Sequence, residues 1–445
     1  MAKKGNLVGG AKAKISLMLT AGLIAGWGIS GYAVILQNNV RKQKILVEKA
    51  ETFIPDKLYI RAADQYIDAL KKYSTKNNTT YERRLLDIYD EGGMTEEYAE
   101  LADDRIDAKT ALADEYQRRA ETLIEEESVK KAILILKQGI DIYHDNELSD
   151  LYESVRYQYR VNGTDYQEGK LPSDDWMIPM WNGEKWGYTG KNGRTVLDFI
   201  YDDATRFSGN YAVVKVDGAY TLIDKNGYWN AVDKSGLDEV SEIAGTKIVG
   251  IKDNKYGIYF NTFERIGEEE YEDVHLNDNG MILVKKAGQW AILNEDMKNV
   301  TDFVFKDVAV NSKDQVYSSN CAVVADENGY FLVDKKGKAC FEKRFPAAKG
   351  IESGYYAVAD ESGQWGFADE KGELVIPCQY EDVYSFSDQV AAVKYAGKWG
   401  YINERGDMVI DAQFSSAFPF QNGKAMVQDE QGNIEILELR FFDTF

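Results

Sequence analysis

The stretch QWGFADEKGELVIPCQYEDVYSF, residues 364–386, decides the fold, because the chain repeats it. Residues 185–207 read KWGYTGKNGRTVLDFIYDDATRF and residues 398–420 read KWGYINERGDMVIDAQFSSAFPF, and the three copies align without a gap. In each copy a tryptophan precedes a glycine and an aromatic residue, and a turn glycine, an aliphatic pair, a second aromatic residue and a phenylalanine follow. A unit copied at a fixed period indicates a repeat architecture in which neighbouring units stack.

Weaker copies lie between these three. Their anchor residues, each an aromatic residue in the place of the tryptophan, follow one another at steps of 34, 36, 34, 40, 35 and 34 residues, and an eighth, degenerate unit begins near Ile434. The step of 40 contains a polar insert at residues 311–320. We expect each aromatic anchor to fill the gap between units, and the glycine after it to permit a close approach. The predicted structural positions are Trp186, Gly187, Tyr220, Tyr256, Gly257, Trp290, Tyr330, Trp365, Gly366, Trp399 and Gly400.

The repeat region, residues 171–445, is predicted to be all-β. Asn-Gly and Asp-x-x-Gly turns separate short aromatic or β-branched runs, which is typical of consecutive hairpins. Seven to eight units of three or four short strands favour a closed β-propeller, because closure hides the sheet edges. The strand at residues 176–180 would then complete a blade with the strand at residues 434–439. The alternative is an open β-solenoid.

These motifs carry a resemblance. The unit resembles that of the WG-repeat family over residues 176–440, and the match is most specific at Trp186, Trp365 and Trp399. The units anchored at Tyr220, Trp290 and Tyr330 depart from the pattern, because the glycine is missing there. The resemblance implies a β domain used for binding, and it implies no particular ligand.

Residues 15–36, ISLMLTAGLIAGWGISGYAVIL, contain no charged side chain. At 1.5 Å per residue such a helix spans the ~30 Å core of a bilayer. Basic residues flank it, and no clear cleavage site ends it. The sequence therefore predicts an uncleaved signal anchor in the cell membrane, with a cytoplasmic tail at residues 1–14 and the remaining domains outside the cytoplasm.

Residues 41–160 are predicted to be helical. Alanine, leucine and charged residues dominate, and apolar residues recur at three- and four-residue steps. The stretch from Val129 to Tyr159 resembles a tetratricopeptide repeat, with Ala132 and Gly139 near the small positions of its first helix and Leu148 in its second. Such repeats stack into arrays that hold other proteins. A generic helical bundle or stalk is the alternative. The fold class is thus α+β multidomain: a transmembrane helix, helical hairpins and a β-repeat domain.

Composition and motifs argue against several kinds of chemistry. The formal net charge of −21 disfavours nucleic acid as a partner. No metal-binding pattern is formed by Cys321, Cys340 and Cys378, and two histidines are too few for a zinc site. The sequence leaves open whether Cys321 and Cys340 form a disulfide. The acidic pairs at residues 202–203 and 381–382 recur at one repeat position, which favours a turn role over catalysis.

The sequence therefore predicts a membrane-anchored, non-enzymatic binding scaffold whose repeat domain recognises a protein or a glycan. We assign no catalytic residue, no cofactor and no metal ligand. The alternatives are a cell-wall or carbohydrate-active module and a structural spacer.

Overall fold

The computed structural model describes residues 34–73, 75–318 and 320–444. The chain divides into two compact units, residues 1–155 and 156–445. We call them the helical unit and the β unit, and each is described by itself.

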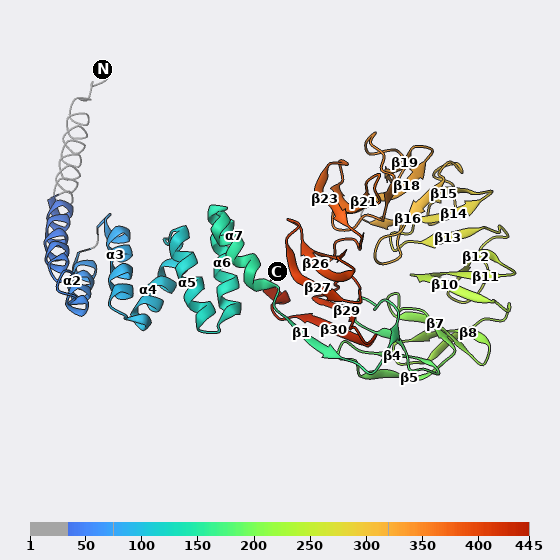
Figure 1. The fold of residues 1–445 in the computed structure, drawn as a ribbon, viewed down its shortest axis with the longest axis horizontal. Helices are drawn as coiled ribbons and strands as arrows, with labels where there is room; N and C mark the ends of the chain where they lie inside the picture. The colour runs from blue at the N-terminus through green and yellow to red at the C-terminus, as the bar shows by residue number, and fades with distance from the viewer. Residues whose placement is uncertain (1–33, 74, 319, 445) are drawn as a thin grey trace, which may run out of the picture. The chain divides into compact units, whose positions relative to one another are not determined.

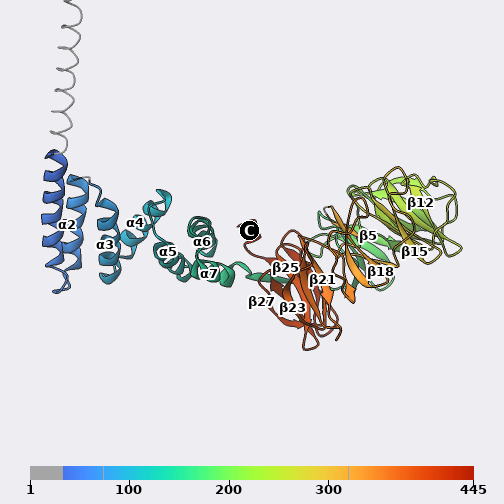
Figure 2. The same cartoon turned by 90° about the horizontal axis from the view of Figure 1, so that it is seen from above.

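The helical unit is a succession of helices that pack in chain order (Figures 1 and 2). Small and aromatic residues form its core, among them Ala62 and Tyr66 on one helix and Leu86 on the next. The helices are residues 34–51, α2 (Tyr59–Lys72), α3 (Asn78–Glu91), α4 (Thr95–Asp107), α5 (Ala113–Glu125), α6 (Val129–Tyr143) and α7 (Asn146–Arg156).

The two helices predicted on either side of residues 144–146 are present as α6 and α7, but α6 also packs closely on α5. Gly139 of α6 marks the crowded point. A Cβ atom there would lie 3.0 Å from the Tyr116 ring of α5 and 3.0 Å from Leu148 Cδ1 of α7. The small residue is therefore required because three helices meet at this position.

Buried ion pairs connect consecutive helices. Arg105 of α4 and Glu115 of α5 are 2% and 1% exposed, and two hydrogen bonds of 2.7 and 3.0 Å join them. Arg105 also donates to Glu82 of α3 at 2.9 Å. A second buried arginine, Arg119, forms a two-bond pair with Asp103. Buried charges of this kind require partners, since an unpaired one costs several kcal/mol.

The predicted localisation needs correction. Within the part of the chain that the structure describes, no helix is both long enough and apolar enough to cross a membrane. The described helix at residues 34–51 carries charged side chains from Arg41 onward. Residues 1–14, and residues 15–33 of the expected span, lie outside the described residues. The prediction of a single-pass protein of the cell membrane is contradicted by this finding.

The β unit is a β-propeller whose described strands form eight antiparallel sheets around a ring (Figure 1). We number the sheets around the ring as blades 1–8. Within each blade, the list begins with the strand nearest the centre of the ring. Blades 1–4 contain β2 (Glu168–Gly169), β3 (Ile178–Trp181), β4 (Trp186–Thr189), β5 (Thr195–Tyr201); β6 (Asp203–Ala204), β7 (Tyr211–Val216), β8 (Ala219–Asp224), β9 (Trp229–Val232); β10 (Glu239–Ala244), β11 (Lys247–Lys252), β12 (Lys255–Phe260); and β13 (Asp273–Leu276), β14 (Ile282–Lys286), β15 (Gln289–Leu293).

Blades 5–8 follow along the chain. Blade 8 also contains one strand from the start of the β unit, β1. Blades 5–8 contain β16 (Asp307–Ala309), β17 (Tyr317–Ser318), β18 (Cys321–Asp326), β19 (Gly329–Asp334); β20 (Ala347–Ala348), β21 (Tyr355–Ala359), β22 (Trp365–Asp369), β23 (Leu374–Tyr380); β24 (Asp382–Val383), β25 (Val390–Tyr395), β26 (Lys398–Asn403), β27 (Met408–Phe414); and β28 (Ser416–Ala417), β29 (Lys424–Gln428), β30 (Ile434–Leu439), β1 (Tyr159–Gly163). A short 3₁₀ helix, Phe442–Thr444, follows.

Strand β1 closes the ring. It pairs antiparallel with β30 from Tyr159↔Leu439 to Gly163↔Glu435, and Thr164 Oγ1 donates to Ile434 O at 2.7 Å. The prediction that residues 176–180 provide the closing strand is wrong, since Ile178 begins β3 of blade 1. Strand β1 was missed because it is short and its first two residues lie in the stretch predicted to be helical, residues 41–160.

An apolar cluster lies between each blade and the next, all the way round. The cluster that joins blade 8 to blade 1 contains Ile434 and Ile436 on one side and Ile178 and Met180 on the other. The ring is therefore closed by packing as well as by hydrogen bonds, which excludes the open solenoid.

Candidate binding site in the central cavity

The predicted aromatic anchors lie on the third strand of blades 1–7. Each belongs to, or packs against, the apolar cluster between its own blade and the next. Trp186 and Trp399 are 8% exposed and Trp290 is 2% exposed. The structure thus places Trp186, Tyr220, Tyr256, Trp290, Tyr330, Trp365 and Trp399 between blades, where a soluble ligand does not reach the buried ones.

In the blades of Trp365 and Trp399, the glycine that follows the anchor lies under the fourth strand. A Cβ atom on Gly366 would lie 2.4 Å from Ile376 O, and one on Gly400 would lie 2.6 Å from Ile410 O. At Gly187 it would meet the Phe199 ring at 2.7 Å, whereas at Gly257 it would meet only the Tyr259 ring, at 3.0 Å. The seven-residue outer strands β5, β23 and β27 occur in the three blades with Trp-Gly.

Two lysines connect successive blades over the anchors. Lys170 Nζ lies 4.6 Å from the centre of the Trp186 ring and donates to Asp203 Oδ1 at 2.8 Å. Lys349 Nζ repeats this arrangement, 5.0 Å from the Trp365 ring and 2.6 Å from Asp382 Oδ1. The second acid of each recurring pair therefore binds a lysine of the preceding blade. The cation is satisfied there, because each lysine also donates to a backbone carbonyl.

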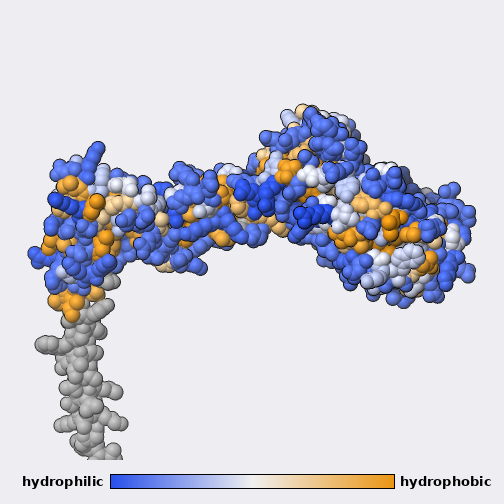
Figure 3. Space-filling model, turned by 90° about the horizontal axis from the view of Figure 1, so that it is seen from below, coloured by the Kyte–Doolittle hydropathy of each residue, from blue (hydrophilic) through white to orange (hydrophobic). Residues whose placement is uncertain are grey.

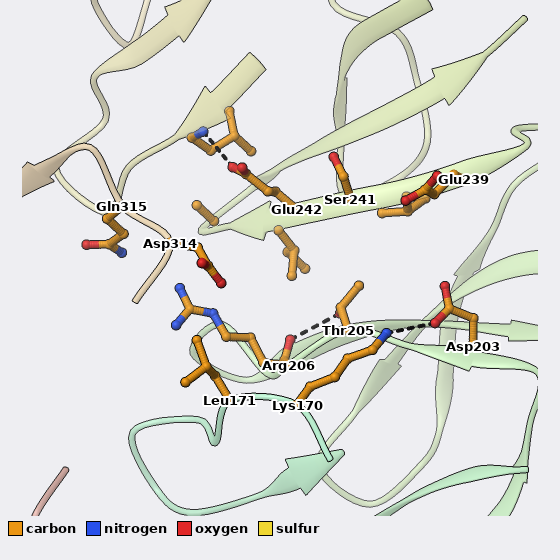
Figure 4. Close-up of a pocket in the computed structure, with 14 residues that line it drawn as sticks. Lys170, Leu171, Asp203, Thr205, Arg206, Glu239, Ser241, Glu242, Asp314 and Gln315 are labelled. Carbon is orange, nitrogen blue, oxygen red and sulfur yellow. Dashed lines mark hydrogen bonds and ion pairs between the residues drawn. The ribbon is translucent and has the colours of Figure 1, made fainter. Parts of the chain in front are cut away.

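A cavity of about 290 Å³ opens among the innermost strands of blades 1–4 (Figure 4). Six of the 14 residues that line it are charged, namely Lys170, Asp203, Arg206, Glu239, Glu242 and Asp314. Pockets of this size lie at the lower end of the range for small ligands. The cavity therefore has room for a few side chains of a partner, and its recognition is polar.

Two opposite charges in this cavity lack partners. No hydrogen bond or ion pair involves the Arg206 guanidinium or the Asp314 carboxylate among the residues that the structure describes, and Figure 4 shows the two groups pointing toward each other. Burial raises the pKa of Asp314, although the charges of Arg206 and His275 act in the opposite direction. Asp314 is exposed and Arg206 is half-buried, so both charged groups are accessible to a ligand from solvent.

A third acid of the cavity is already satisfied. Glu242 Oε1 lies 2.7 Å from His275 Nδ1, and Glu242 Oε2 accepts from the Leu276 N–H at 2.8 Å. The Trp290 ring stacks on His275 with centroids 5.4 Å apart. Burial disfavours the charged imidazole, but Glu242 outweighs it and raises the pKa of His275.

The polar insert of blade 5 brings Asp314 to the cavity. Asn277 Oδ1 accepts from the Tyr317 N–H at 2.8 Å, which ties the insert to blade 4. On the other side Ser312 Oγ donates to Glu352 Oε2 of blade 6 at 2.5 Å. The insert is therefore held on both sides. Sequence reasoning noticed its extra length but missed Arg206, Glu239, Glu242 and Asp314. The one sequence signal for this insert was the step of 40 residues between the anchors Trp290 and Tyr330.

The cysteines and potential metal ligands give no competing site among the described residues. Cys321, Cys340 and Cys378 are free thiols. Burial raises the pKa of Cys321 to about 12, so its thiol is protonated at neutral pH. No group of three or more histidine, cysteine or acidic side chains in the described ranges is placed to hold a metal ion.

Three segments of the chain match the family model described as WG containing repeat: residues 186–220, 365–399 and 399–432. A search of the curated proteins found no match. These three segments begin at the Trp-Gly blades, where the fourth strand is longest.

Similar solved structures include a eukaryotic initiation factor, at 10% identity and TM-score 0.43, which covers 62% of this chain and 85% of that one. The WD40 beta propeller domain of Doa1 is 14% identical, with TM-score 0.30 and coverage of 54% and 92%. The Neurospora crassa Pan2 WD40 domain is 10% identical, with TM-score 0.35 and coverage of 62% and 90%. These values carry no argument about ligands. What this chain offers is an eight-bladed β-propeller with three WG-type blades and a charged central cavity.

Proposed function

We propose that this chain is a non-enzymatic binding scaffold whose propeller receives a segment of a partner protein in its central cavity. The observation that carries the proposal is the Arg206–Asp314 couple: two opposite charges face each other at the accessible wall of the cavity, and neither side chain forms a hydrogen bond or an ion pair with another described residue. A rigid ring that holds such a couple is suited to recognition.

The helical unit supports the same proposal. Its helices pack in chain order, as they do in tetratricopeptide arrays, and such arrays usually hold another protein. We propose that the helical unit positions a protein partner while the cavity recognises part of it.

The test is site-specific cross-linking. A photo-reactive amino acid replaces Ser241 or Gln315, both of which line the cavity, or Asn192 in an exposed turn as the control. We expect one protein to be cross-linked from both cavity positions and not from the turn, and Arg206→Glu to abolish the product. Equal labelling from the turn, or no product from the cavity positions, would reject the proposal.

A second candidate function is glycan binding, because one blade displays aromatic side chains to solvent. Tyr228 and Trp229, at the outer strand of blade 2, are 71% and 57% exposed. Figure 3 shows hydrophobic residues gathered in patches on the β unit. Exposed aromatic rings stack on sugars, so a glycan array probed with wild type and with Trp229→Ala tests this candidate. Identical array signals from the two proteins would reject it.

A further inference from the structure

We infer that the central cavity recognises a partner segment that carries an acidic and a basic side chain close together. This inference rests on the proposed function, and it names the chemistry that the cavity selects. The ligand's carboxylate would bind Arg206, and its ammonium or guanidinium group would bind Asp314.

Arg206 is the available cation of the cavity. Its guanidinium presents five donors in a planar fork that matches a carboxylate with two parallel hydrogen bonds. Lys170, the other cation of the wall, already donates to Asp203 and to Ala204 O at 2.8 and 2.7 Å. An incoming carboxylate therefore finds its free donors on Arg206 rather than on Lys170.

Asp314 and Glu239 are the available acids. Glu242 is satisfied by His275 and by the Leu276 N–H, whereas no described residue donates a side-chain hydrogen bond to Asp314 or Glu239. With Lys170 paired to Asp203 and His275 paired to Glu242, one cation and two acids remain. Both acids are exposed. A ligand with only a carboxylate would gain nothing from them, whereas a ligand that also carries a cation would gain an ion pair.

The two unpaired groups come from separate elements that fix their positions. Arg206 follows β6 of blade 2, and Asp314 lies in the insert of blade 5, which hydrogen bonds hold to blades 4 and 6. They face each other but do not form an ion pair (Figure 4). A ligand with both charges can therefore enter between them and satisfy both, which selects against ligands with one charge.

The experiment compares four blocked tetrapeptides on the full-length chain. They are acetyl-Gly-Lys-Glu-Gly-amide, the Lys-Gln and Gln-Glu analogues with one charge each, and the neutral Gln-Gln analogue. Saturation-transfer difference NMR at low ionic strength gives the four dissociation constants. We expect the doubly charged peptide to bind at least ten-fold more tightly than either singly charged peptide.

Two variants assign the charges. Arg206→Gln should remove the preference for glutamate over glutamine, and Asp314→Asn should remove the preference for lysine. The exposed residues Arg194 and Asp217 provide the matched controls Arg194→Gln and Asp217→Asn, which should leave all four constants unchanged. Circular dichroism checks that each variant is folded.

Three results would overturn the inference: equal binding of singly and doubly charged peptides, binding of none of the four, or an equal loss in the control variants. The cross-linking experiment distinguishes rejection of this ligand chemistry from rejection of the proposed function. A partner cross-linked from the cavity, without the charge preference, would retain the proposed function and reject this ligand chemistry.

Discussion

The helical unit and the β unit solve the problem of holding repeated elements together in different ways. Consecutive helices are joined by buried ion pairs such as Arg105–Glu115, whose partners are only ten residues apart. Consecutive blades are joined by apolar clusters, and the cluster between blades 8 and 1 joins Ile434 of β30 to Ile178 of β3, from opposite ends of the unit. Buried ion pairs therefore hold neighbouring helices together in the helical unit, whereas apolar packing between the first and last blades closes the ring in the β unit.

The difference can be measured because the two units have different spectroscopic reporters. Seven of the chain's eight tryptophans lie in the β unit, and the eighth is Trp27. Tryptophan fluorescence therefore reports mainly the unfolding of the β unit, while circular dichroism at the helical minimum is dominated by the helical unit. The predictions below use both signals during denaturation.

The largest expected effect is a cavity between blades 7 and 8. Tyr401 is fully buried, packs on Phe420 with ring centroids 4.8 Å apart, and donates to Phe418 O at 2.8 Å. Tyr401→Ala should lower the free energy of unfolding of the β unit by about 3–5 kcal/mol for the lost packing, with about 1 kcal/mol more for the hydrogen bond. The helical signal should not move. Tyr395→Ala, at a side chain that is 52% exposed in the same sheet, is the control and should have little effect.

The next effect concerns the buried charges. Arg105→Met removes both hydrogen bonds to the buried Glu115 and leaves it one longer ion pair, with Arg83 Nε at 3.8 Å, so it should cost the helical unit about 3–5 kcal/mol. Arg105→Met with Glu115→Leu should recover much of this loss, because a buried ion pair is often replaceable by apolar residues. If the double variant is less stable than the single one, apolar residues cannot replace the Arg105–Glu115 pair, and the pair itself stabilises the helical unit.

A smaller effect distinguishes the WG-type blades from the others. Gly366→Ala places a Cβ atom against three backbone atoms of the fourth strand within 2.8 Å, and we expect it to cost about 1–3 kcal/mol. Gly257→Ala meets only a tyrosine side chain at 3.0 Å, so it should cost clearly less. Denaturant midpoints by tryptophan fluorescence measure both. Equal losses would show that the glycine does not serve the fourth strand.

The smallest effect is on pH dependence. The pKa of His275 is raised in the folded state, mainly by Glu242 against the opposing effect of burial, with Asp273 and Asp314 adding to the increase. The resulting stability is fully present below the ordinary histidine pKa of about 6.5 and is lost as pH rises through the higher folded pKa. The β unit should therefore become less stable as pH rises from 6 to 9, and Glu242→Gln should flatten this dependence. An unchanged slope in that variant would contradict the assignment.

The repeat period carried most of what the sequence predicted about the fold. Anchors such as Trp186, Trp365 and Trp399 recur with fixed spacing because each blade needs the same contact with the next. This spacing favoured a β-propeller over an open solenoid, and the structure confirms the propeller. The helices were equally readable, because apolar stripes such as that of α2 have a clear period. Local patterns were sufficient for both.

The closing strand and the cavity were not predictable by the same reasoning. Strand β1 has the burial pattern of an exposed edge, and its partner lies at the other end of the chain, so no local pattern marks it. Arg206 and Asp314 belong to different blades, and their proximity depends on ring geometry. Positions that recur in every repeat reveal the structure that the blades share. A site built from residues that occur in one blade only leaves no recurring pattern in the sequence.

The pairing of β1 with β30 has a consequence for how the chain is made. Residues 159–163 leave the ribosome well before their partner at residues 434–439. Domains generally fold as units during synthesis, N-terminal first, so the helices have time to assemble while the ring stays open. During that interval one blade edge has unpaired backbone groups, which makes the growing chain vulnerable to aggregation or to strand exchange with another copy.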